Sequence, residues 1–278
     1  MILIADSGST KATWCLIEKN ATVRYFETEG YNPYFRTATS IKESMIMEMP
    51  HDFDKEAITE LYFYGAGCFP EKESIIKEAF GEIFKKAVIF VYLDLLGAAR
   101  SLLGDGSGIV AILGTGSNSC MYKEGRIIRN IDSLGYLLGD EGSGCDIGKK
   151  LIGDYIRGYM PLDIQESFIE QYTFSPSALM EYVYNQPLVN RYCASFSLFA
   201  GKHMGHPYID SLIKTSFDNF FRNLVCKYDD YLEAGFNCVG SVAFTFSLQL
   251  KISCNNAGMN FEKLIKAPID GLVEYHHK

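Results

Sequence analysis

The chain contains one pattern of short apolar strands and polar turns twice, about a hundred residues apart. In the first copy, strands are predicted at residues 2–5, 12–17 and 22–28, with turns at 6–11 and 18–20. In the second copy, strands are predicted at residues 109–113, 119–122 and 126–131, with turns at 114–118 and 123–125. Apolar runs bounded by Gly, Ser and Thr are typical of β-hairpins. The repeat therefore indicates a duplicated lobe, although the copies share a pattern more than residue identities.

Helices and further strands follow these hairpins and predict an α/β architecture. Strands at residues 61–64 and 88–92 alternate with helices at 71–84 and from Asp94 onward, as is typical of α/β folds. An apolar stripe at helical spacing over residues 208–234 predicts a long helix that packs in a core or a lobe interface.

The glycine-rich segment at residues 104–108 is the clearest flexible joint in the sequence. We therefore divide the chain into an N-terminal lobe of residues 1–105 and a C-terminal lobe of residues 106–278. In the second lobe, a short strand at residues 236–239 leads into Gly240 and Ser241, which open another helix.

The composition limits the kinds of partner. The formal net charge is −8 and no basic stripe is present, so we predict no nucleic-acid partner. A phosphate site in such a negative field would need local N–H groups, a lysine and a metal ion. No apolar run approaches the ~20 residues of a membrane helix, and the apolar opening is too short for a signal peptide. We therefore expect a cytoplasmic protein with no membrane partner.

The eight cysteines show neither a CxxC pair nor a zinc-type spacing with histidine. We interpret them as reduced, buried thiols that pack as small apolar side chains. His276 and His277 are interpreted as exposed surface residues rather than ligands.

The polar turn at residues 6–11 follows a buried strand directly and could bind a phosphate. Glycine lets the backbone approach a ligand closely, and the hydroxyl and N–H groups of Ser9 and Thr10 can line a phosphate. Lys11 could supply positive charge, and Asp6 at the strand end could hold Mg²⁺, directly or through water. The same residues also suit an ordinary hairpin turn.

Two further polar turns offer similar chemistry. Gly114, Thr115 and Gly116 begin a turn that heads the second copy of the repeat, so two hairpins could grip a polyphosphate from both sides. Gly240 and Ser241 follow a later strand and suit an adenine or ribose, which needs close backbone approach and little charge. Together the three turns favour a nucleotide site over three unrelated turns.

Several acids lie where a ligand could reach them. Asp140 and Glu141, in a glycine-rich loop at residues 139–144, could bind sugar hydroxyls or Mg²⁺, or could be ordinary acids near a helix N-terminus. Asp94 is either an N-cap or a carboxylate at the carboxyl end of a strand, where α/β ligand sites form. The GxxxxGK[ST] loop, the GxGxxG turn after a strand and the GxSxG elbow are absent from the sequence.

Five motifs, in this order, resemble the BadF/BadG/BcrA/BcrD ATPase family and, within it, the N-acetylglucosamine kinase branch. They are Asp6–Lys11, Asp94 with residues 97–99, Gly114–Asn118, the loop at 139–144 and residues 240–243. The resemblance spans residues 2 to about 273, and its most specific parts are the strings Leu-Gly-Thr-Gly-Ser-Asn and Gly-Asp-Glu-Gly-Ser-Gly. The family belongs to the sugar kinase, Hsp70 and actin superfamily. The resemblance therefore implies an α/β fold of two RNase H-like lobes with a cleft between them.

The resemblance also implies ATP and Mg²⁺ as cofactors, a homodimer, and a role for each matching residue. Asp6 would organise Mg²⁺ through water, and Thr10 and Thr115 would contact the ATP phosphates. Asp94 looks like the base that takes the proton of the attacking sugar hydroxyl. The other matching positions would bind the sugar (Asn32, Ser117, Asn118 and Asp140) or ATP (Ser9, Lys11, Gly114, Gly116, Gly240 and Ser241).

The implied reaction is phosphorylation of an N-acetylated amino sugar, with N-acetylglucosamine as the first choice and N-acetylmuramic acid as its rival. Leu134 stands where animal N-acetylglucosamine kinases carry tryptophan, so we expect a different pocket wall; Ser7 stands where relatives often have glycine. Two alternatives belong to other classes. One is an ATPase activator of a dehydratase or reductase, for which no cluster-ligand pair of cysteines can be assigned. The other is an Hsp70-like binding module, for which no peptide-binding domain is recognised.

Overall fold

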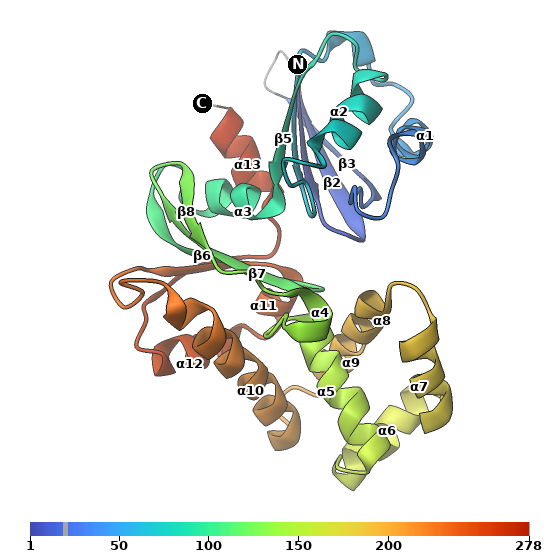
Figure 1. Ribbon diagram of the computed structural model, residues 1–278, viewed down its shortest axis with the longest axis vertical. Helices are drawn as coiled ribbons and strands as arrows, with labels where there is room; N and C mark the ends of the chain where they lie inside the picture. Colours follow the sequence, from blue (N-terminus) through green and yellow to red (C-terminus); the bar gives the residue numbers. More distant parts are fainter. Residues whose placement is uncertain (19–21, 278) are drawn as a thin grey trace. The chain divides into compact units, whose positions relative to one another are not determined.

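The computed structural model describes residues 1–18 and 22–277, which form two compact units (Figure 1). The first unit comprises Met1–Gly106, Glu124–Arg126 and Ala267–Lys278, and the second comprises Ser107–Lys123 and Ile127–Lys266. The turn predicted at residues 18–20 includes two residues outside the described part.

The first unit contains a five-stranded mixed sheet in the order β3-β2-β1-β4-β5. Its strands are β1 (Ile2–Ser7), β2 (Lys11–Ile17), β3 (Val23–Glu29), β4 (Glu60–Gly65) and β5 (Val88–Leu93). The first three strands pair antiparallel, whereas β4 pairs parallel with both β1 and β5. The carboxyl ends of three parallel strands therefore meet at one edge of this sheet.

Two pairs of helices cover the two faces of this sheet. Alternate strand residues pack against α1 (Ala38–Glu48) and α2 (Glu73–Gly81), in a core around Trp14. The other face packs against α3 (Asp94–Leu103) and α13 (Ile269–His276), and α13 lies beside α3 (Figure 1). Because successive side chains of a strand point to opposite faces, the apolar residues of β1 and β2 contribute alternately to the two cores.

The second unit repeats the sheet of the first. Its order is β10-β9-β6-β7-β8, in which β6 pairs antiparallel with β7 and parallel with β9. The strands are β6 (Ser107–Leu113), β7 (Ser117–Lys123), β8 (Arg126–Asn130), β9 (Phe236–Val239) and β10 (Phe261–Ile265). Taken in chain order, the five strands of each unit occupy the same positions, which confirms the predicted α/β class with a duplicated lobe.

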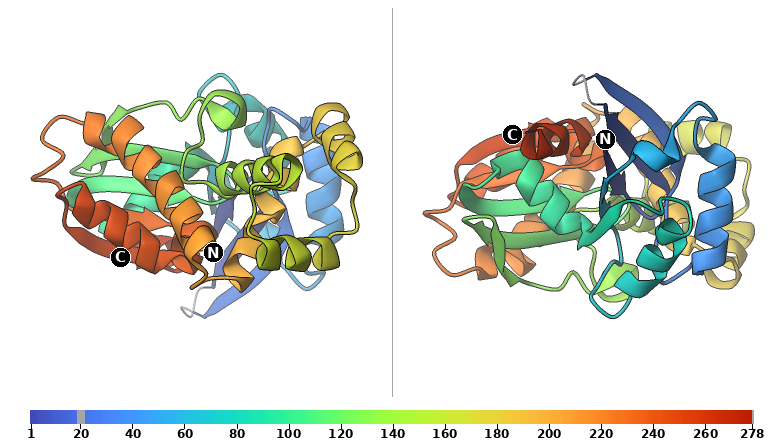
Figure 2. Two further views of the ribbon diagram at one scale, coloured as in Figure 1. Left: turned by 90° about the horizontal axis from the view of Figure 1, so that it is seen from below. Right: turned by 90° about the horizontal axis from the view of Figure 1, so that it is seen from above.

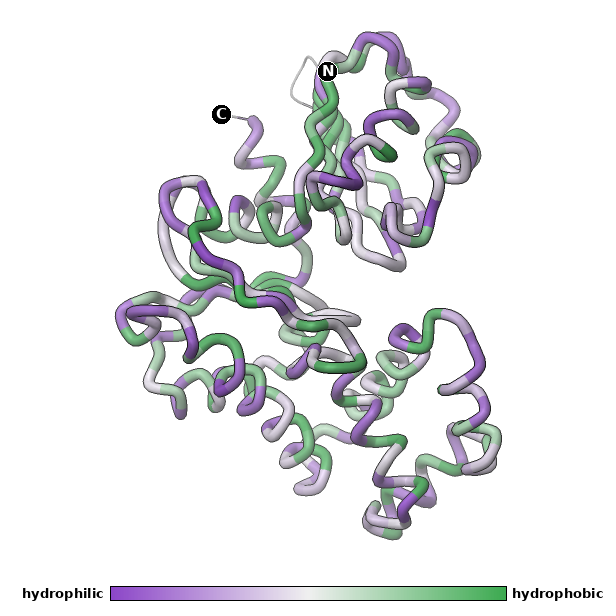
Figure 3. Tube along the Cα trace, in the orientation of Figure 1, coloured by the Kyte–Doolittle hydropathy of each residue, from purple (hydrophilic) through white to green (hydrophobic). Residues whose placement is uncertain are grey.

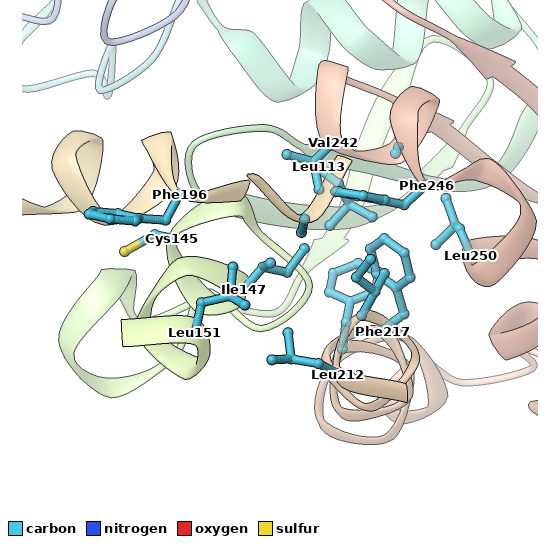
Figure 4. Packing of buried hydrophobic residues seen from close by; sticks show 14 of the residues in the cluster. Leu113, Cys145, Ile147, Leu151, Phe196, Leu212, Phe217, Val242, Phe246 and Leu250 are labelled. Atoms are coloured by element: carbon cyan, nitrogen blue, oxygen red, sulfur yellow. The ribbon is translucent and has the colours of Figure 1, made fainter. Parts of the chain in front are cut away.

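Three helices contribute to the core of the second unit. They are α5 (Gly144–Arg157), α10 (Pro207–Asn223) and α12 (Ser247–Asn256), and α10 crosses in front of the strands in the left view of Figure 2. Along α10, apolar and polar residues alternate at helical spacing (Figure 3). Figure 4 shows Ile147 and Leu151 of α5 in the same cluster as Phe217 of α10 and Leu250 of α12.

Shorter elements complete the described part of the chain. They are η1 (Lys55–Ala57), α4 (Gly135–Leu138), α6 (Leu162–Gln171), α7 (Pro176–Asn185), α8 (Val189–Ser195), α9 (Ser197–Lys202), η2 (Val225–Lys227) and α11 (Ser241–Thr245). Of the helices described, none combines the length and the apolar character that crossing a bilayer requires. All eight cysteines are free; seven are buried and Cys226 is half-buried, as their interpretation as packed thiols predicted.

The helix predicted over residues 208–234 is too long, because α10 ends at Asn223. After Asn223 the chain is no longer α-helical, but the apolar residues Leu224, Val225 and Tyr228 are still buried. The hydroxyl of Tyr228 bonds the backbone of Ser119 and Ile131 on the neighbouring hairpin, and these contacts direct the chain away from the helix axis. Tertiary hydrogen bonds thus override the local helical pattern.

Two other expectations differ from the structure near the end of the chain. Residues 267–278, expected in the second lobe, belong to the first unit, since Ile269 and Leu272 are buried against its sheet. His276 is half-buried rather than exposed: it stacks on Tyr62 at 3.8 Å between ring centroids and bonds the hydroxyl of Tyr64. His277 is exposed, as expected.

The joint predicted at residues 104–108 is a tight turn that leads directly into a strand. Gly104 caps α3 with a φ of 58°, a conformation that glycine adopts without strain. Ser107 and Gly108 already belong to β6.

Candidate functional site

The ends of three parallel strands bring two carboxylates together in the first unit. Ser7, Gly65 and Leu93 are aligned across β1, β4 and β5. Asp6 lies one residue before the end of β1, and Asp94 follows β5 as the first residue of α3. The negative charge of Asp94 acts on the carboxyl group of Asp6.

Both carboxyl groups have raised pKa values. Burial, reinforced by the negative charge of Asp94, raises the pKa of Asp6 from 3.8 to about 7. Burial raises the pKa of Asp94 to about 6, against the opposing effect of its hydrogen bonds to backbone N–H groups. Raised pKa values of neighbouring acids at a strand end are a common mark of a functional site. A carboxylate with a pKa near 6 is a suitable proton acceptor at neutral pH.

The backbone holds Asp94 in a defined position. Leu93 is the N-cap residue of α3, so the N-cap role considered for Asp94 belongs to its neighbour. The Leu95 N–H group donates to Oδ1 of Asp94 at 2.9 Å, which leaves Oδ2 as the oxygen not used in that bond. The start of α3 thereby orients this carboxylate.

The polar turn after β1 lies against the segment that carries Asn32. Ser7 is buried, and its hydroxyl accepts the N–H group of Tyr31 at 3.0 Å. A Cβ atom at Gly30 would lie 2.7 Å from the carbonyl carbon of Ser9, so only glycine fits there. The structure thus brings Asn32 to the turn, where its Nδ2 group donates to the Ser9 hydroxyl at 3.4 Å.

Of the next two residues of the turn, Thr10 is exposed and Lys11 is already paired with an acid. Thr10 is exposed at the tip of the turn. Lys11 forms an ion pair with Glu27 across β2 and β3, and both side chains are more than half exposed. A phosphate at this turn would have to compete with Glu27 for the lysine.

In the second unit, the turn between β6 and β7 receives the start of α5. The N–H groups of Gly144 and Cys145 donate to the carbonyl oxygens of Gly114 and Thr115, at 2.8 and 3.1 Å. Gly114 N–H bonds the carbonyl of Gly116 within the turn at 3.0 Å. These backbone hydrogen bonds fix the conformation of the turn without a ligand.

Asp140 and Ser117 form the buried polar pair of this turn. Oδ1 of Asp140 accepts the N–H group of Ser117 at 3.1 Å, and burial raises the pKa of this carboxyl in spite of that bond. Asp140 has a φ of 57°, which is strained for a residue with a side chain. The hydroxyl oxygen of Ser117 is buried and has no hydrogen-bond partner among the described residues. A buried hydroxyl without a partner is costly unless a ligand supplies one.

The neighbouring polar side chains are already engaged. Oδ1 of Asn118 accepts from Ser119 N–H at 2.9 Å and from Asn130 Nδ2 at 3.0 Å, and its own Nδ2 group takes no part in those bonds. Glu141 accepts a hydrogen bond from Asn223 at 2.7 Å. Of the two loop acids, Asp140 is therefore the one directed at the turn.

The third polar turn lies against the end of β6. Gly240 has a φ of 133°, and a Cβ atom there would lie 2.7 Å from the carbonyl carbon of Leu113. Ser241, which follows, lines a cavity of about 570 Å³, within the usual size range of ligand pockets. The cavity is lined by Gln171, Tyr172, Ser195, Ser197, Leu198, Gly201, Lys202, Ser241, Val242, Thr245 and Phe246. Sequence reasoning missed every lining residue except Ser241, because no motif marks the loops and helices that supply them.

The described residues include no group of three or more His, Cys, Asp or Glu side chains that could hold a metal ion. Mg²⁺ does not require such a group, because it is usually bound through one or two carboxylates, waters and substrate phosphates. Asp6 with its neighbour Asp94 fits that donor set. The acids of the first unit therefore suit a magnesium–phosphate complex rather than a permanently bound metal.

The two matching sheets and the polar turns after their first strands define the sugar kinase, Hsp70 and actin superfamily. No family profile and no curated protein sequence matches the chain. Among solved structures, a provisionally named N-acetylglucosamine kinase from Porphyromonas gingivalis is 38% identical, with a TM-score of 0.95 over 100% of this chain and 99% of that chain. The chain belongs to the family of this protein.

Two more distant structures share the fold. A provisionally named N-acetylglucosamine kinase from Chromobacterium violaceum is 17% identical, with a TM-score of 0.71 over 99% of this chain and 98% of that one. A ROK family glucokinase from Streptomyces griseus, solved with glucose and AMPPNP, is 14% identical, with a TM-score of 0.55 over 99% and 97%.

We predict that replacing Asp6 by asparagine raises the melting temperature at about pH 8 and leaves it unchanged below about pH 4. The folded-state pKa of Asp6 is about 7 against an ordinary value of 3.8, so stability falls as the pH rises from about 4 to about 7 and stays at the lower level above that. Asparagine removes that cost, and below the ordinary pKa the wild-type carboxyl is neutral in both states. Thermal melts of both proteins across this range, without metal, test the sign. The exposed Asp105→Asn variant is the control, and a gain at pH 8 equal to that of the control would contradict the prediction.

Proposed function

We propose that this protein transfers the γ-phosphoryl group of ATP to a hydroxyl of an N-acetylated amino sugar, in the N-acetylglucosamine kinase branch of the BadF/BadG/BcrA/BcrD ATPase family. The observation that carries the proposal is the pair of half-buried carboxylates with raised pKa values, Asp6 near the end of β1 and Asp94 after the end of β5. The 38% identity to the Porphyromonas gingivalis protein supports it independently.

In the first unit, Asp94 acts as the general base. Its free Oδ2 accepts the proton as the sugar oxygen bonds to the γ-phosphorus and the bond to ADP breaks. Its Oδ1 stays bonded to Leu95 N–H, so the carboxylate keeps its direction during the transfer. Asp6 would hold Mg²⁺, and the ion would supply positive charge that neutralises the phosphates. The turn at Ser9 and Thr10 offers hydroxyl and N–H groups to phosphate oxygens.

In the second unit, Thr115 and its glycine neighbours bind phosphate, and Gly240 and Ser241 lie at the adenosine. Gly240 allows close backbone approach, and the cavity beside Ser241 has the size for an adenine and ribose. That the Streptomyces griseus glucokinase was solved with glucose and AMPPNP supports ATP as the donor for this fold.

The sugar is bound by polar side chains, one of which still needs a hydrogen-bond partner. The Ser117 hydroxyl is buried without one, and Asp140 beside it is an acceptor of raised pKa. In the second unit, Asn118 supplies an amide group. In the first unit, the resemblance gives Asn32 a sugar-binding role, and its amide lies at the Ser9 hydroxyl. Leu134, which is 59% exposed, leaves an apolar position where tryptophan stands in animal enzymes. N-acetylglucosamine is our first choice of substrate and N-acetylmuramic acid the alternative.

No specific observation favours an ATPase activator that serves an iron–sulfur cluster shared between subunits. Such a cluster needs cysteine sulfur at a surface, whereas seven of the eight cysteines are buried and Cys226 is half-buried.

We expect N-acetylglucosamine or N-acetylmuramic acid to stimulate Mg²⁺-dependent release of ADP well above the sugar-free background. The assay compares these sugars with glucosamine and glucose, each with Mg²⁺ and with excess chelator. Stimulation by neither N-acetylated sugar, together with stimulation by a redox partner protein, would show that the kinase proposal is wrong.

Replacing Ser117 by alanine should stabilise the protein by about 1 kcal/mol and raise the KM of the sugar roughly tenfold. The substitution removes a buried hydroxyl without a partner, and it also removes the hydrogen bond that we assign to the sugar. Ser119→Ala is a matched control, since its hydroxyl already bonds Tyr228 at 2.9 Å and its loss should destabilise without changing the KM. Equal sugar KM values for wild type and Ser117→Ala would remove Ser117 from the sugar site.

Asp94→Asn should lower kcat by about 10²–10⁴-fold and leave the melting temperature unchanged or slightly raised. The asparagine oxygen can still accept the Leu95 N–H group, so only proton acceptance is lost. Asp94→Ala, which also loses that hydrogen bond, should cost about 1 kcal/mol of stability. Asp163→Asn, in the first turn of α6, controls for a lost charge near a helix start. A near-normal kcat in Asp94→Asn would refute the assignment of the base.

A further inference from the structure

The helix that carries Asp94 is held between a strand and another helix by two contacts that only glycine permits. A Cβ atom at Gly97 of α3 would lie 2.9 Å from Cβ of Tyr64 on β4. A Cβ atom at Gly271 of α13 would lie 2.5 Å from the carbonyl oxygen of Ser101 on α3 and 2.9 Å from its Cα atom. Real Cβ atoms essentially never approach so closely, so both helix backbones lie against their neighbours at these points.

A chain of hydrogen bonds joins the same three elements. Nη1 of Arg100 on α3 donates to the Tyr64 hydroxyl at 2.8 Å, and that hydroxyl lies 2.8 Å from Nε2 of His276 on α13. Burial and the charge of Arg100 lower the pKa of His276 to about 4, so its ring is neutral at physiological pH. The Tyr64 hydroxyl accepts from Arg100 and, in the tautomer with unprotonated Nε2, donates to His276.

Aromatic rings hold the guanidinium of Arg100 from two sides. It lies 4.6 Å from the ring centre of Tyr92 on β5 and 5.1 Å from that of Tyr275 on α13. Arg100 is thus tied to β4, β5 and α13 at once.

These contacts determine where Asp94 lies. Gly97 is one helical turn from Asp94 and Arg100 less than two turns, so both act on a short, stiff segment of about 9 Å. Tyr64 on β4 pairs with Asp6 on β1 and with Tyr92 on β5. The strand that contacts α3 through Tyr64 therefore also fixes the alignment of β1, which carries Asp6, with β5, which precedes Asp94. Asp94 is the first residue of α3, so its position follows from that of the helix.

We propose that α13 is a positioning element for the catalytic base: Gly271 and the His276–Tyr64–Arg100 chain set the place of α3 and hence of the Asp94 carboxylate. This inference rests on the proposed function for the role of Asp94, but the contacts hold whatever the reaction. A misplacement of about 1 Å can cost roughly 10²-fold in rate, because the base must meet the hydroxyl at hydrogen-bond distance.

The test compares variants that disturb α13 without touching Asp94. Gly271→Ala forces α13 away from Ser101, and Tyr64→Phe keeps the ring but removes the shared hydroxyl. Both should lower kcat by roughly 10-fold or more and leave the KM of ATP unchanged. His276→Ala should behave similarly, and His276→Gln, which can still bond Tyr64, should recover much of the loss.

Gly81→Ala is the matched control, because its Cβ would meet only Cδ1 of Ile89 at 4.0 Å. A structural role alone would lower the fraction of folded protein and leave kcat per folded molecule unchanged. A wild-type kcat in Gly271→Ala and Tyr64→Phe, or losses equal to that of Gly81→Ala, would overturn the proposal.

Hydrogen–deuterium exchange gives a readout that does not depend on activity. The Leu95 amide, which donates to Asp94, should exchange faster in Gly271→Ala and Tyr64→Phe than in wild type or Gly81→Ala. Unchanged exchange at Leu95 refutes the positioning role even if the wild type phosphorylates no sugar. A wild type inactive toward every sugar but with faster exchange in both variants refutes the proposed function alone.

Discussion

The parallel pairing of β1, β4 and β5 is the interaction on which the candidate site of the first unit depends. Backbone hydrogen bonds between these strands align Ser7, Gly65 and Leu93, so the residues at the strand ends emerge at one edge. Two parallel neighbours lie about 4.8 Å apart, which places the ends of β1 and β5 roughly 10 Å from each other across β4. At that separation, charged side chains can act on each other electrostatically, and the charge of Asp94 raises the pKa of Asp6.

The arrangement is held at a cost in stability. Asp6 and Asp94 are ionisable groups with raised pKa values, and a negative charge on one opposes a negative charge on the other. In the second unit, Ser117 buries a hydroxyl without a partner and Asp140 adopts a strained φ. Such unfavourable features persist where the packing around them holds them in place. They are expected at sites where a ligand will supply the missing charge or hydrogen bond. The well-packed apolar cores on either side of each sheet offset this cost.

Much of the fold could be predicted because period-two apolar patterning and polar turns are local properties. The strand β9 was predicted with its observed bounds, and the first three strands of each unit were found with errors of one or two residues. The end of α10 could not be predicted, since the hydroxyl of Tyr228 finds its partners about a hundred residues away on β7 and β8. For the same reason, nothing local marked His276 as buried, because its stacking partner Tyr62 lies on β4.

By itself, the sequence determined the chemistry at the ends of the strands: an aspartate before a Ser-Gly-Ser-Thr turn, a second aspartate after a buried strand, and a glycine-rich turn repeated in the second unit. These are consecutive residues, and their conformations follow from neighbouring side chains and glycine. Only the tertiary structure decided which groups meet and which are already occupied. It brings Asn32 to Ser9, engages Lys11 with Glu27, and leaves the Ser117 hydroxyl without a partner. It also places α13 against α3, because Gly271 packs directly on Ser101, which lies 170 residues earlier in the chain.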